Sequence, residues 1–343
     1  MSTDIVLDAG TYKTVLYSAG KVVLEQPSAV AVDSETYEPI AFGEEAKRMF
    51  GKTPASVTLV FPIERGAVSD YELAEEMIVH FIKSTFNNRV IKPRVIAVVP
   101  SDVTTVQHHS IANAISAAGC RNISTIESTI ASSVGLDIDI SKPDGNMIVD
   151  IGGGTVNIAT VSMGDIAQND TLRLGSIDFD DAIIKYVRYS KNILIGGQTA
   201  EQIKRTIGSA VKREFEVTMR AKGRNIFTGL PESFYVSSTE IYNAISDLLT
   251  QICTACQNVL ENTDPDIVAD VSKNGVYLLG GGAKLYGIDK LLEEYLSIKV
   301  KRVEDDSVGA LKGAYKVLKT PSIIKNSDYQ QRSIQKLIVN DEI

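Results

Sequence analysis

Tryptophan is absent from the 343-residue sequence, and cysteine and histidine occur three times each. An odd number of cysteines cannot pair completely, which argues against a secreted disulfide framework and favours a reducing cytoplasm. No apolar run approaches the ~18 residues of a membrane span, and we find no signal peptide. The formal net charge of −8 argues against non-specific nucleic-acid binding, which needs clustered Lys and Arg. We therefore expect a cytoplasmic protein without a nucleic-acid partner.

The few cysteines and histidines offer little for a metal site. Cys253 and Cys256 are two residues apart in a stretch with helical periodicity. They are either a redox or zinc pair or two small residues one helical turn apart, and the second interpretation is favoured. His108 and His109 are adjacent, so they point in different directions from a helix and are expected on the solvated surface.

The chain does contain strands regularly interleaved with helices, and 44% of its residues are apolar. This alternation predicts α/β layers with mixed sheets. The length is sufficient for two domains, each with its own core.

The most informative stretch is 146–162, where one apolar strand ends at Asp150 and a second strand follows a short turn. The turn and its flank are Gly152, Gly153, Gly154 and Thr155. Glycines let the backbone approach a ligand closely, and their N–H groups can surround an anion. The carboxylate would face the metal ion of a phosphate through water, because Mg²⁺ keeps several waters. The alternative is an ordinary tight hairpin with a turn aspartate.

A similar pattern occurs at residues 4–17. Asp8, Gly10 and Thr11 repeat Asp150, the glycine turn and Thr155. Two phosphate hairpins suggest two similar domains that face each other across a nucleotide. Neither copy is a Walker loop or a dinucleotide fingerprint, because those motifs lead from a strand into a helix.

Two later stretches add candidate binding residues. Residues 275–284 are a strand that ends in a third glycine triplet, near a helix start, which again suits an anion. A helix over 199–208, capped by Thr199, carries three charged residues on adjacent turns: Glu201, Lys204 and Arg205. Taken alone, these three are equally consistent with surface ion pairs.

Together these motifs resemble the actin, Hsp70 and sugar-kinase superfamily, and within it the chain is most similar to the MreB family of bacterial actins. The resemblance runs from about residue 4 to about residue 318. The segments that carry it are 41–54, 62–70, 149–155, 199–210 and 280–283. It implies an actin-like (ribonuclease H-like) α/β fold with two duplicated domains and four subdomains around a nucleotide cleft.

The resemblance also implies the subdomain boundaries. They are 1–32 and 62–143 plus 318–343 for IA, 33–61 for IB, 144–182 and 246–317 for IIA, and 183–245 for IIB. The 33–61 insertion is too short for a second substrate-binding domain. This length favours a filament protein over a sugar kinase.

By resemblance, Asp8 and Asp150 would hold Mg²⁺ and its waters, and the two hairpin turns would hold the phosphates of ATP or ADP. The residues of these turns are Gly10, Thr11, Tyr12 and Lys13 in the first, and Gly152, Gly153, Gly154 and Thr155 in the second. Family members usually have a neutral residue in place of Lys13, which either contacts the phosphates or is solvated. The residues expected around the adenosine are Glu201, Lys204, Arg205, Gly281, Gly282 and Ala283.

The catalytic pattern departs from that of the family. Where MreB relatives have Ile-Glu-Glu-Pro, with the second Glu positioning the attacking water, this chain has Ile126, Glu127, Ser128 and Thr129. Ser128 therefore occupies the catalytic position, and Val156 replaces a usual threonine. Loss of a general base costs ~10²–10⁴-fold, so we expect Mg-ATP binding with weak hydrolysis. The alternative is that Glu127 takes over after a small backbone shift.

The resemblance implies a cytoskeletal protein that assembles into filaments for cell shape. The alternative is a non-polymerising ATPase or kinase with an Hsp70-like or sugar-kinase-like nucleotide domain. We expect the chain to assemble with itself in paired protofilaments, and with paralogous filament proteins, because the missing tryptophan and the changed catalytic positions suggest a divergent paralogue. Membrane association through the loop at 86–92 is expected to be weak or indirect, at the inner face of the cell membrane.

Overall fold

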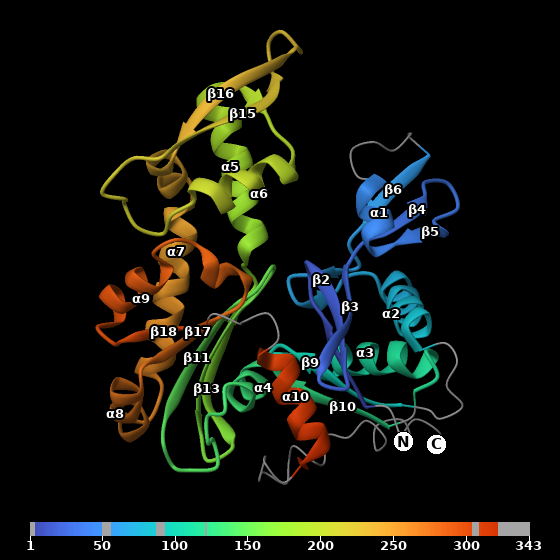
Figure 1. Cartoon of the computed structure of the whole chain (residues 1–343), viewed down its shortest axis with the longest axis vertical. Coiled ribbons are helices and arrows are strands. Elements are labelled where there is room, and N and C mark those ends of the chain that lie inside the picture. The colour runs from blue at the N-terminus through green and yellow to red at the C-terminus, as the bar shows by residue number, and fades with distance from the viewer. Residues whose placement is uncertain (1–3, 50–55, 87–92, 121, 304–308, 322–343) are drawn as a thin grey trace. The chain divides into compact units, whose positions relative to one another are not determined.

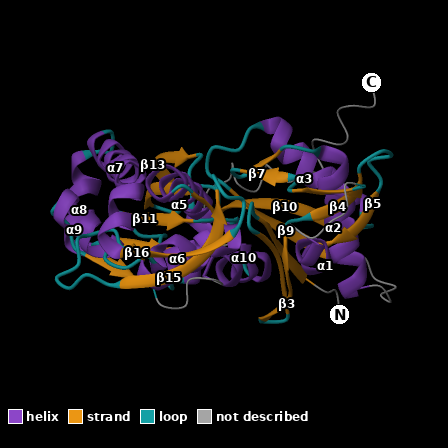
Figure 2. Cartoon of the chain, turned by 90° about the horizontal axis from the view of Figure 1, so that it is seen from above, coloured by secondary structure: helices purple, strands orange, loops and turns teal. Residues whose placement is uncertain are grey.

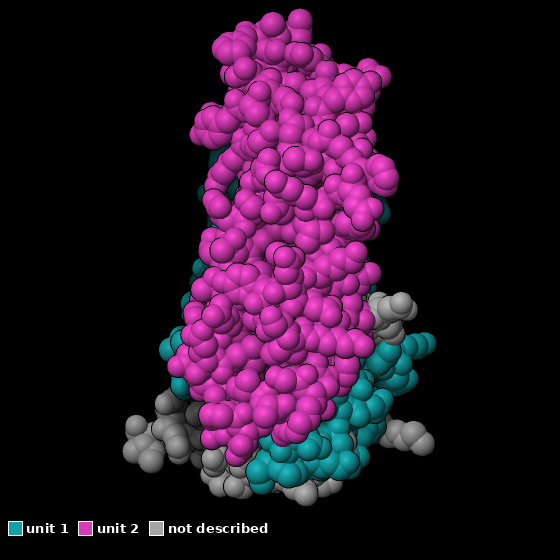
Figure 3. Space-filling view, turned by 90° about the vertical axis from the view of Figure 1, so that its left-hand side faces the viewer, with its two compact units in different colours: residues 1–144, 161–171, 305–343 teal, residues 145–160, 172–304 magenta. Residues whose placement is uncertain are grey.

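The computed structural model describes residues 4–49, 56–86, 93–120, 122–303 and 309–321. The chain forms two compact units (Figures 1 and 3). Unit 1 comprises 1–144, 161–171 and 305–343, and unit 2 comprises 145–160 and 172–304. Most of the expected membrane loop, 87–92, lies outside the described residues.

A five-stranded sheet forms the centre of unit 1. Its order is β10-β9-β1-β2-β3. The bounds are Asp4–Ala9 for β1, Lys13–Ser18 for β2, Lys21–Pro27 for β3, Arg94–Val99 for β9 and Asn122–Glu127 for β10. β1 and β2 form an antiparallel hairpin, while β1, β9 and β10 run parallel.

Helices cover both faces of this sheet. Alternate side chains of β1, Ile5 and Leu7, pack with the buried faces of α2 (Tyr71–Phe86) and α3 (Thr105–Ala117). On the other face, Tyr17, which is paired with Val6, meets Tyr315 of α10 edge to face, with ring centroids 5.5 Å apart. Figure 2 shows these helices on either side of the strands.

The α4 and α10 helices of unit 1 (Ser128–Gly135 and Gly309–Lys319) approach each other closely. A Cβ at Gly313 would overlap the carbonyl oxygen of Ala131, and a Cβ at Gly135 would overlap the carbonyl oxygen of Gly309. Glycine is therefore required at these two contact points, because any side chain would separate the helix backbones.

A smaller three-stranded sheet, ordered β5-β4-β6, and helix α1 form a separate layer of unit 1. The bounds are Val30–Asp33 for β4, Pro39–Phe42 for β5, Gly43–Met49 for α1 and Val57–Val60 for β6. Tyr37 donates a hydrogen bond of 2.9 Å from its hydroxyl to Asp70, and Phe42 stacks on His80. These contacts connect this layer to α2. A two-stranded ribbon follows, formed by β7 (Ile63–Glu64) and β8 (Ala67–Val68).

The main sheet of unit 2 repeats the strand order of the first sheet. It is ordered β13-β12-β11-β17-β18, and most of β13 belongs to unit 1. The bounds are Asn146–Ile151 for β11, Val156–Ser162 for β12, Asp165–Leu172 for β13, Val276–Leu279 for β17 and Val300–Arg302 for β18. β11, β17 and β18 run parallel. β11 therefore corresponds to β1, and β17 to β9, as expected for duplicated domains.

Helices and a second small sheet complete unit 2. The helices are α5 (Ser176–Lys191), α6 (Gly197–Ile207), α7 (Ser238–Glu261), α8 (Pro265–Asn274), the 3-10 turn η1 (Gly281–Lys284) and α9 (Ile288–Leu296). The small sheet is ordered β14-β15-β16, with bounds Ile193–Leu194, Thr218–Asn225 and Pro231–Ser237. The expected cap at Thr199 is wrong, because α6 begins two residues earlier and its N-cap is Gly196.

Cys253 and Cys256 lie in the core of unit 2, exposed by 1% and 0%. Burial raises the pKa of the Cys253 thiol to about 11, so it stays protonated and unreactive. The described residues contain no group of three His, Cys, Asp or Glu suited to a metal ion. The two cysteines are thus small core residues. Among the described helices, none is long and apolar enough to cross a membrane.

A buried carboxylate connects three elements of unit 1. Asp4, at the start of β1, accepts hydrogen bonds of 2.8 and 2.9 Å from the Arg94 guanidinium of β9. The Lys319 ammonium, in the last turn of α10, lies 2.6 Å from the same carboxylate. The side chain of Asp4 is 0% exposed, whereas those of Arg94 and Lys319 are 39% and 49% exposed.

Asp4→Asn is expected to lower the free energy of unfolding by about 2 kcal/mol at neutral pH, because both cations lose their anionic partner. The cost stays below the ~3–5 kcal/mol of a fully buried pair, since the cations are half hydrated. The Arg94 guanidinium holds the pKa of Asp4 below its usual value. The stabilisation is therefore present above pH ~4 and is lost as the pH falls through the lowered pKa. Denaturant unfolding at several pH values measures both effects, and identical wild-type and variant curves at pH 7 would contradict them.

Candidate functional site

The first hairpin, β1–β2 of unit 1, carries Asp8 one residue before the end of its first strand. Desolvation raises the pKa of Asp8 to about 6, and the positive charge of Lys13 partly opposes this rise. Ser28 stabilises the turn, because its hydroxyl donates a hydrogen bond of 2.6 Å to the carbonyl oxygen of Gly10. A partly buried carboxylate beside a fixed turn is a place where a cation would relieve an electrostatic cost.

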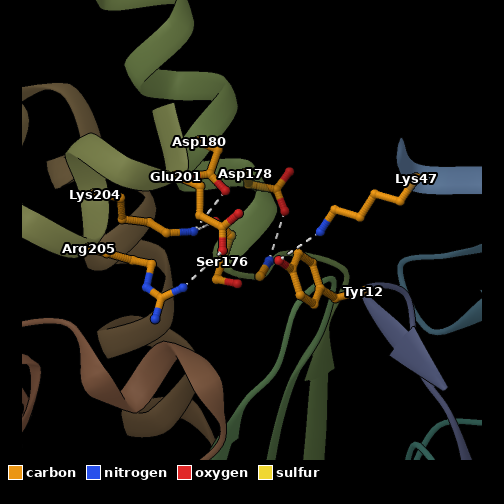
Figure 4. A network of polar contacts seen from close by, with 9 residues as sticks. Tyr12, Lys47, Ser176, Asp178, Asp180, Glu201, Lys204 and Arg205 are labelled. Atoms are coloured by element: carbon orange, nitrogen blue, oxygen red, sulfur yellow. Dashed lines mark hydrogen bonds and ion pairs between the residues drawn. The ribbon is translucent and has the colours of Figure 1, made fainter. Parts of the chain in front are cut away.

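The rest of this turn contacts neighbouring parts of unit 1. The hydroxyl of Thr11 accepts a 3.0 Å hydrogen bond from the backbone N–H of Gly66. The Lys47 ammonium lies 3.2 Å from the Tyr12 hydroxyl and 4.6 Å from the centre of its ring (Figure 4). Lys13 forms a 2.7 Å ion pair with Glu25 of β3. The ammonium of Lys13 therefore already has an anionic partner within its own sheet.

The second hairpin, β11–β12 of unit 2, places Asp150 beside the three glycines. The backbone N–H of Gly152 donates to the carbonyl of Thr155 at 2.8 Å and closes the turn. Gly280 has a φ of +85°, and a Cβ there would overlap both the Asp150 carboxylate and the carbonyl oxygen of Ile151. Glycine at 280 is thus what leaves room for the carboxylate.

The N-terminal turn of α5 holds the shape of the glycine turn. The backbone N–H groups of Ser176 and Ile177 donate to the carbonyls of Gly152 and Gly153, at 3.0 and 2.9 Å. A Cβ at Gly175 would overlap the Gly153–Gly154 backbone. Because two carbonyls of the turn are bound from this side, its backbone is fixed before any ligand arrives.

The three charged residues of α6 divide into two groups. Lys204 is largely buried, with its ammonium 2.6 Å from the Ser176 carbonyl oxygen and 2.8 Å from Asp180 (Figure 4). Burial raises the pKa of Asp180 to about 6, while the charge of Lys204 lowers it. Within the described part of the chain, the second oxygen of Asp180 is buried without a hydrogen-bond partner. Lys204 thus connects α6 to the turn that supports the glycines.

Glu201 and Arg205 lie on the more exposed side of α6. Their charged groups are 3.8 Å apart. Both line a shallow depression of about 290 Å³, together with Gln198, Gln202 and Thr206. A flat ligand such as a base or a ribose could rest against this depression, whereas Lys204 faces away toward α5.

The third glycine triplet lies against the end of β11. Gly281, Gly282 and Ala283 form the turn η1, and Ala283 donates from its N–H to the carbonyl of Gly280 at 3.0 Å. A Cβ at Gly282 would overlap the side chain of Ile151. Unit 2 therefore brings its second and third glycine motifs together around Asp150.

The positions expected to be catalytic differ in exposure. Ser128 is the first residue of α4 and is 7% exposed, and its hydroxyl has no hydrogen-bond partner among the described residues. Glu127 ends β10, is partly exposed and precedes the helix as its N-cap. Val156 is fully buried in the core of unit 2 and offers only methyl groups.

The residues present fit a magnesium nucleotide. Mg²⁺ prefers carboxylate oxygens and water, and each unit by itself has one carboxylate beside its glycine turn, Asp8 in unit 1 and Asp150 in unit 2, in each case one residue before the end of the strand. The desolvated Asp8 would be relieved by such a cation. The glycine turn of unit 2 has the open, pre-formed backbone that a phosphate requires.

Some supporting residues were not predicted from the sequence as parts of the site. They are Ser28, Asp180 and Gly280. For Gly280 the signal was available, because it opens the third glycine triplet. For Ser28 and Asp180 no local pattern distinguishes them from ordinary polar residues, since their partners lie 18 and 24 residues away.

Known proteins match this chain over most of its length. The sequence model of the family described as MreB/Mbl protein matches residues 2–326. The cell shape-determining protein MreB of Escherichia coli K12 is 36% identical over 324 residues, covering 92% of this chain and 93% of that protein.

Solved structures are also similar. MreB5 of Spiroplasma citri, in crystal structures bound to ADP and to AMPPNP, superposes with a TM-score of 0.88 at 33% identity, covering 94% of this chain and 97% of that one. The MamK double helical filament has a TM-score of 0.79 at 19% identity, covering 93% of this chain and 99% of that one, and supports the fold alone. The sequence-based expectation of an actin-like α/β fold is confirmed.

Proposed function

Because this chain belongs to the MreB/Mbl family of cell shape-determining proteins, we propose that it is a cytoskeletal actin-like protein that binds Mg-ATP and assembles into filaments. The observation that carries the nucleotide part is the pre-formed glycine turn at 152–154, bound from behind by α5 and flanked by Asp150. The similar MreB5 has been crystallised with ADP and with AMPPNP, which supports nucleotide binding by this chain.

The parts of the chain would act as follows. Asp8 and Asp150 would hold the metal ion through its waters, and the two hairpin turns would bind the phosphates. Glu201 and Arg205 would lie against the ribose and adenine, with the 281–283 turn forming the opposite wall. The bound metal would neutralise the charge of the phosphates, and the chain's own residues would fix the position of the nucleotide. The four subdomain boundaries given above remain part of this proposal.

Hydrolysis in this chain would be weak. Ser128 is short and neutral, and its hydroxyl lies buried at the start of α4, so it supplies no carboxylate to orient an attacking water. Val156 adds no hydroxyl, because valine has only methyl groups, and its side chain is buried in the core of unit 2. ATP-bound subunits would therefore persist, and partners rather than hydrolysis would regulate filament turnover.

Ser128→Glu is expected to raise steady-state phosphate release with saturating Mg-ATP by at least about tenfold over a near-zero wild-type rate, because it restores a general base. Ser128→Ala is the matched control and should leave the rate unchanged. Glu127→Gln should also change nothing, because successive residues of a strand point to opposite faces. A wild type with an ordinary rate that Glu127→Gln abolishes would instead assign the role to Glu127.

Finer features of the assembly follow from the same proposal. We expect paired protofilaments, copolymers with paralogous filament proteins, and a cytoplasmic location with weak or indirect attachment to the inner face of the cell membrane. Co-pelleting with vesicles that contain anionic lipid tests the last point, and strong binding of the unassembled chain would contradict it.

A further inference from the structure

The two hairpin turns are held by different groups, although each has two carbonyls that accept hydrogen bonds from outside the turn. In the second turn, backbone N–H groups of α5 donate to Gly152 and Gly153. In the first turn, both donors belong to one residue, Ser28. Its hydroxyl donates to the carbonyl of Gly10 at 2.6 Å, and its backbone N–H donates to the carbonyl of Tyr12 at 3.3 Å. The first turn therefore depends on one side chain for a contact that a helix backbone makes in the second.

Ser28 is itself fixed by its surroundings. It lies between β3 and β4 and is 0% exposed. Its hydroxyl oxygen is 2.9 Å from the hydroxyl oxygen of Thr14, which is also 0% exposed. A serine hydroxyl has a single proton, and that of Ser28 goes to Gly10, so Thr14 is the donor of this second bond. The two hydroxyls thus form a short chain of hydrogen bonds that ends on the turn, and the bonds of such a chain strengthen one another.

The bond from Ser28 also determines where the next N–H of the turn points. In a trans peptide unit the carbonyl of one residue and the N–H of the next lie on opposite sides of the chain. Because the carbonyl of Gly10 is directed to Ser28, the N–H of Thr11 is directed away from Ser28. Without the hydroxyl, the carbonyl would lose this partner and the peptide unit would rotate more freely. Backbone N–H groups in such a turn are the groups that bind an anion.

We propose that Ser28 is a positioning residue for the β- and γ-phosphates of the nucleotide. Its hydroxyl orients the Gly10–Thr11 peptide so that the N–H of Thr11 meets a phosphate oxygen without prior rearrangement. Ser28 does not touch the nucleotide and acts only through the turn, and Thr14 supports it. This inference rests on the proposed binding of Mg-ATP. It adds to the site a residue that is 18 positions from Gly10 in the sequence.

Ser28→Ala in the full-length chain tests this role by the kind of nucleotide that it affects. Competition against a fluorescent ATP analogue should show Mg-ATP binding about tenfold weaker than in the wild type, the lower end of the effect of residues that orient a ligand group. AMP lacks the β- and γ-phosphates, so its affinity should be unchanged. A purely structural role of Ser28 would weaken ATP and AMP alike.

Ser18→Ala is the matched control. Ser18 is 3% exposed at the other end of β2, and its hydroxyl donates to the carbonyl of Asp4 at 2.7 Å. The control therefore loses the same kind of buried hydrogen bond in the same hairpin, away from the turn. Ser18→Ala and Ser28→Ala should lower the midpoint of denaturant unfolding by similar amounts. Only Ser28→Ala should also lose affinity for Mg-ATP.

Ser28→Cys is the second variant, for use if Ser28→Ala does not fold, because a thiol fills the same space but is a weak donor. It should bind Mg-ATP less tightly than the wild type and AMP equally well. A Ser28 variant that binds Mg-ATP like the wild type would overturn the role of Ser28 and leave the proposed function intact. So would an equal loss for ATP and AMP, or a loss of ATP affinity in Ser18→Ala. A wild-type chain that binds no Mg-ATP would overturn the proposed nucleotide binding itself.

Discussion

Gly313→Ala is expected to destabilise unit 1 by about 3–4 kcal/mol, above the ~1–3 kcal/mol that overpacking typically costs. The added methyl group would occupy the same space as the carbonyl oxygen of Ala131 in α4. That oxygen belongs to a helix backbone and cannot rotate away like a side chain. The two helices must therefore separate, and buried contacts along α4 and α10 are lost with them.

Gly309→Ala is the matched control for this effect. Gly309 lies one helical turn earlier on α10, and none of the described residues has an atom within 4 Å of a Cβ placed there. The Gly309→Ala variant should unfold at nearly the same denaturant concentration as the wild type, because alanine also favours helix. Equal midpoints for the Gly313 and Gly309 variants in denaturant unfolding would contradict the close helix contact.

Gly280→Ala is expected to weaken Mg-ATP binding about 100-fold, the upper range for residues that orient a metal ligand. Alanine is strained at a φ of +85°, and its Cβ would overlap the Asp150 carboxylate. The carboxylate must then leave the position from which it would hold the metal's waters. Titration with a fluorescent nucleotide measures the loss.

The role assigned to Asp150 also predicts how the loss of nucleotide affinity depends on Mg²⁺. Without Mg²⁺, most of the difference between wild type and Gly280→Ala should disappear, because the displaced carboxylate acts on the metal. Gly197→Ala, at an open position of unit 2 with no positive φ, serves as the control and should bind normally. An equal loss with and without Mg²⁺ would show that the substitution only distorts the backbone.

The sequence predicted those features of the fold and the site that depend on the conformation of a short backbone segment. The glycine hairpins, the third triplet and the duplication into two similar domains could all be predicted, because glycine spacing and strand periodicity are local signals. The family and the actin-like fold followed from the same motifs and are confirmed. The roles of individual site residues stay predictions.

Contacts between distant elements could not be predicted. Lys204 was expected beside the ribose and adenine by resemblance to the MreB family. In the structure its ammonium is bound by Asp180 and Ser176, which belong to another helix. Spacing on one helix shows which residues share a face, but not which neighbouring helix that face meets. The depth at which Ser128 is buried depends on three-dimensional packing in the same way.

The most direct test of the central claim measures pelleted protein and released phosphate in the same Mg-ATP sample over time. The expected result is stable filaments with far less than one phosphate released per subunit, because Ser128 cannot activate water. Filaments that form, release phosphate at an ordinary rate and then disassemble would contradict the claim, as would a chain that remains in the supernatant.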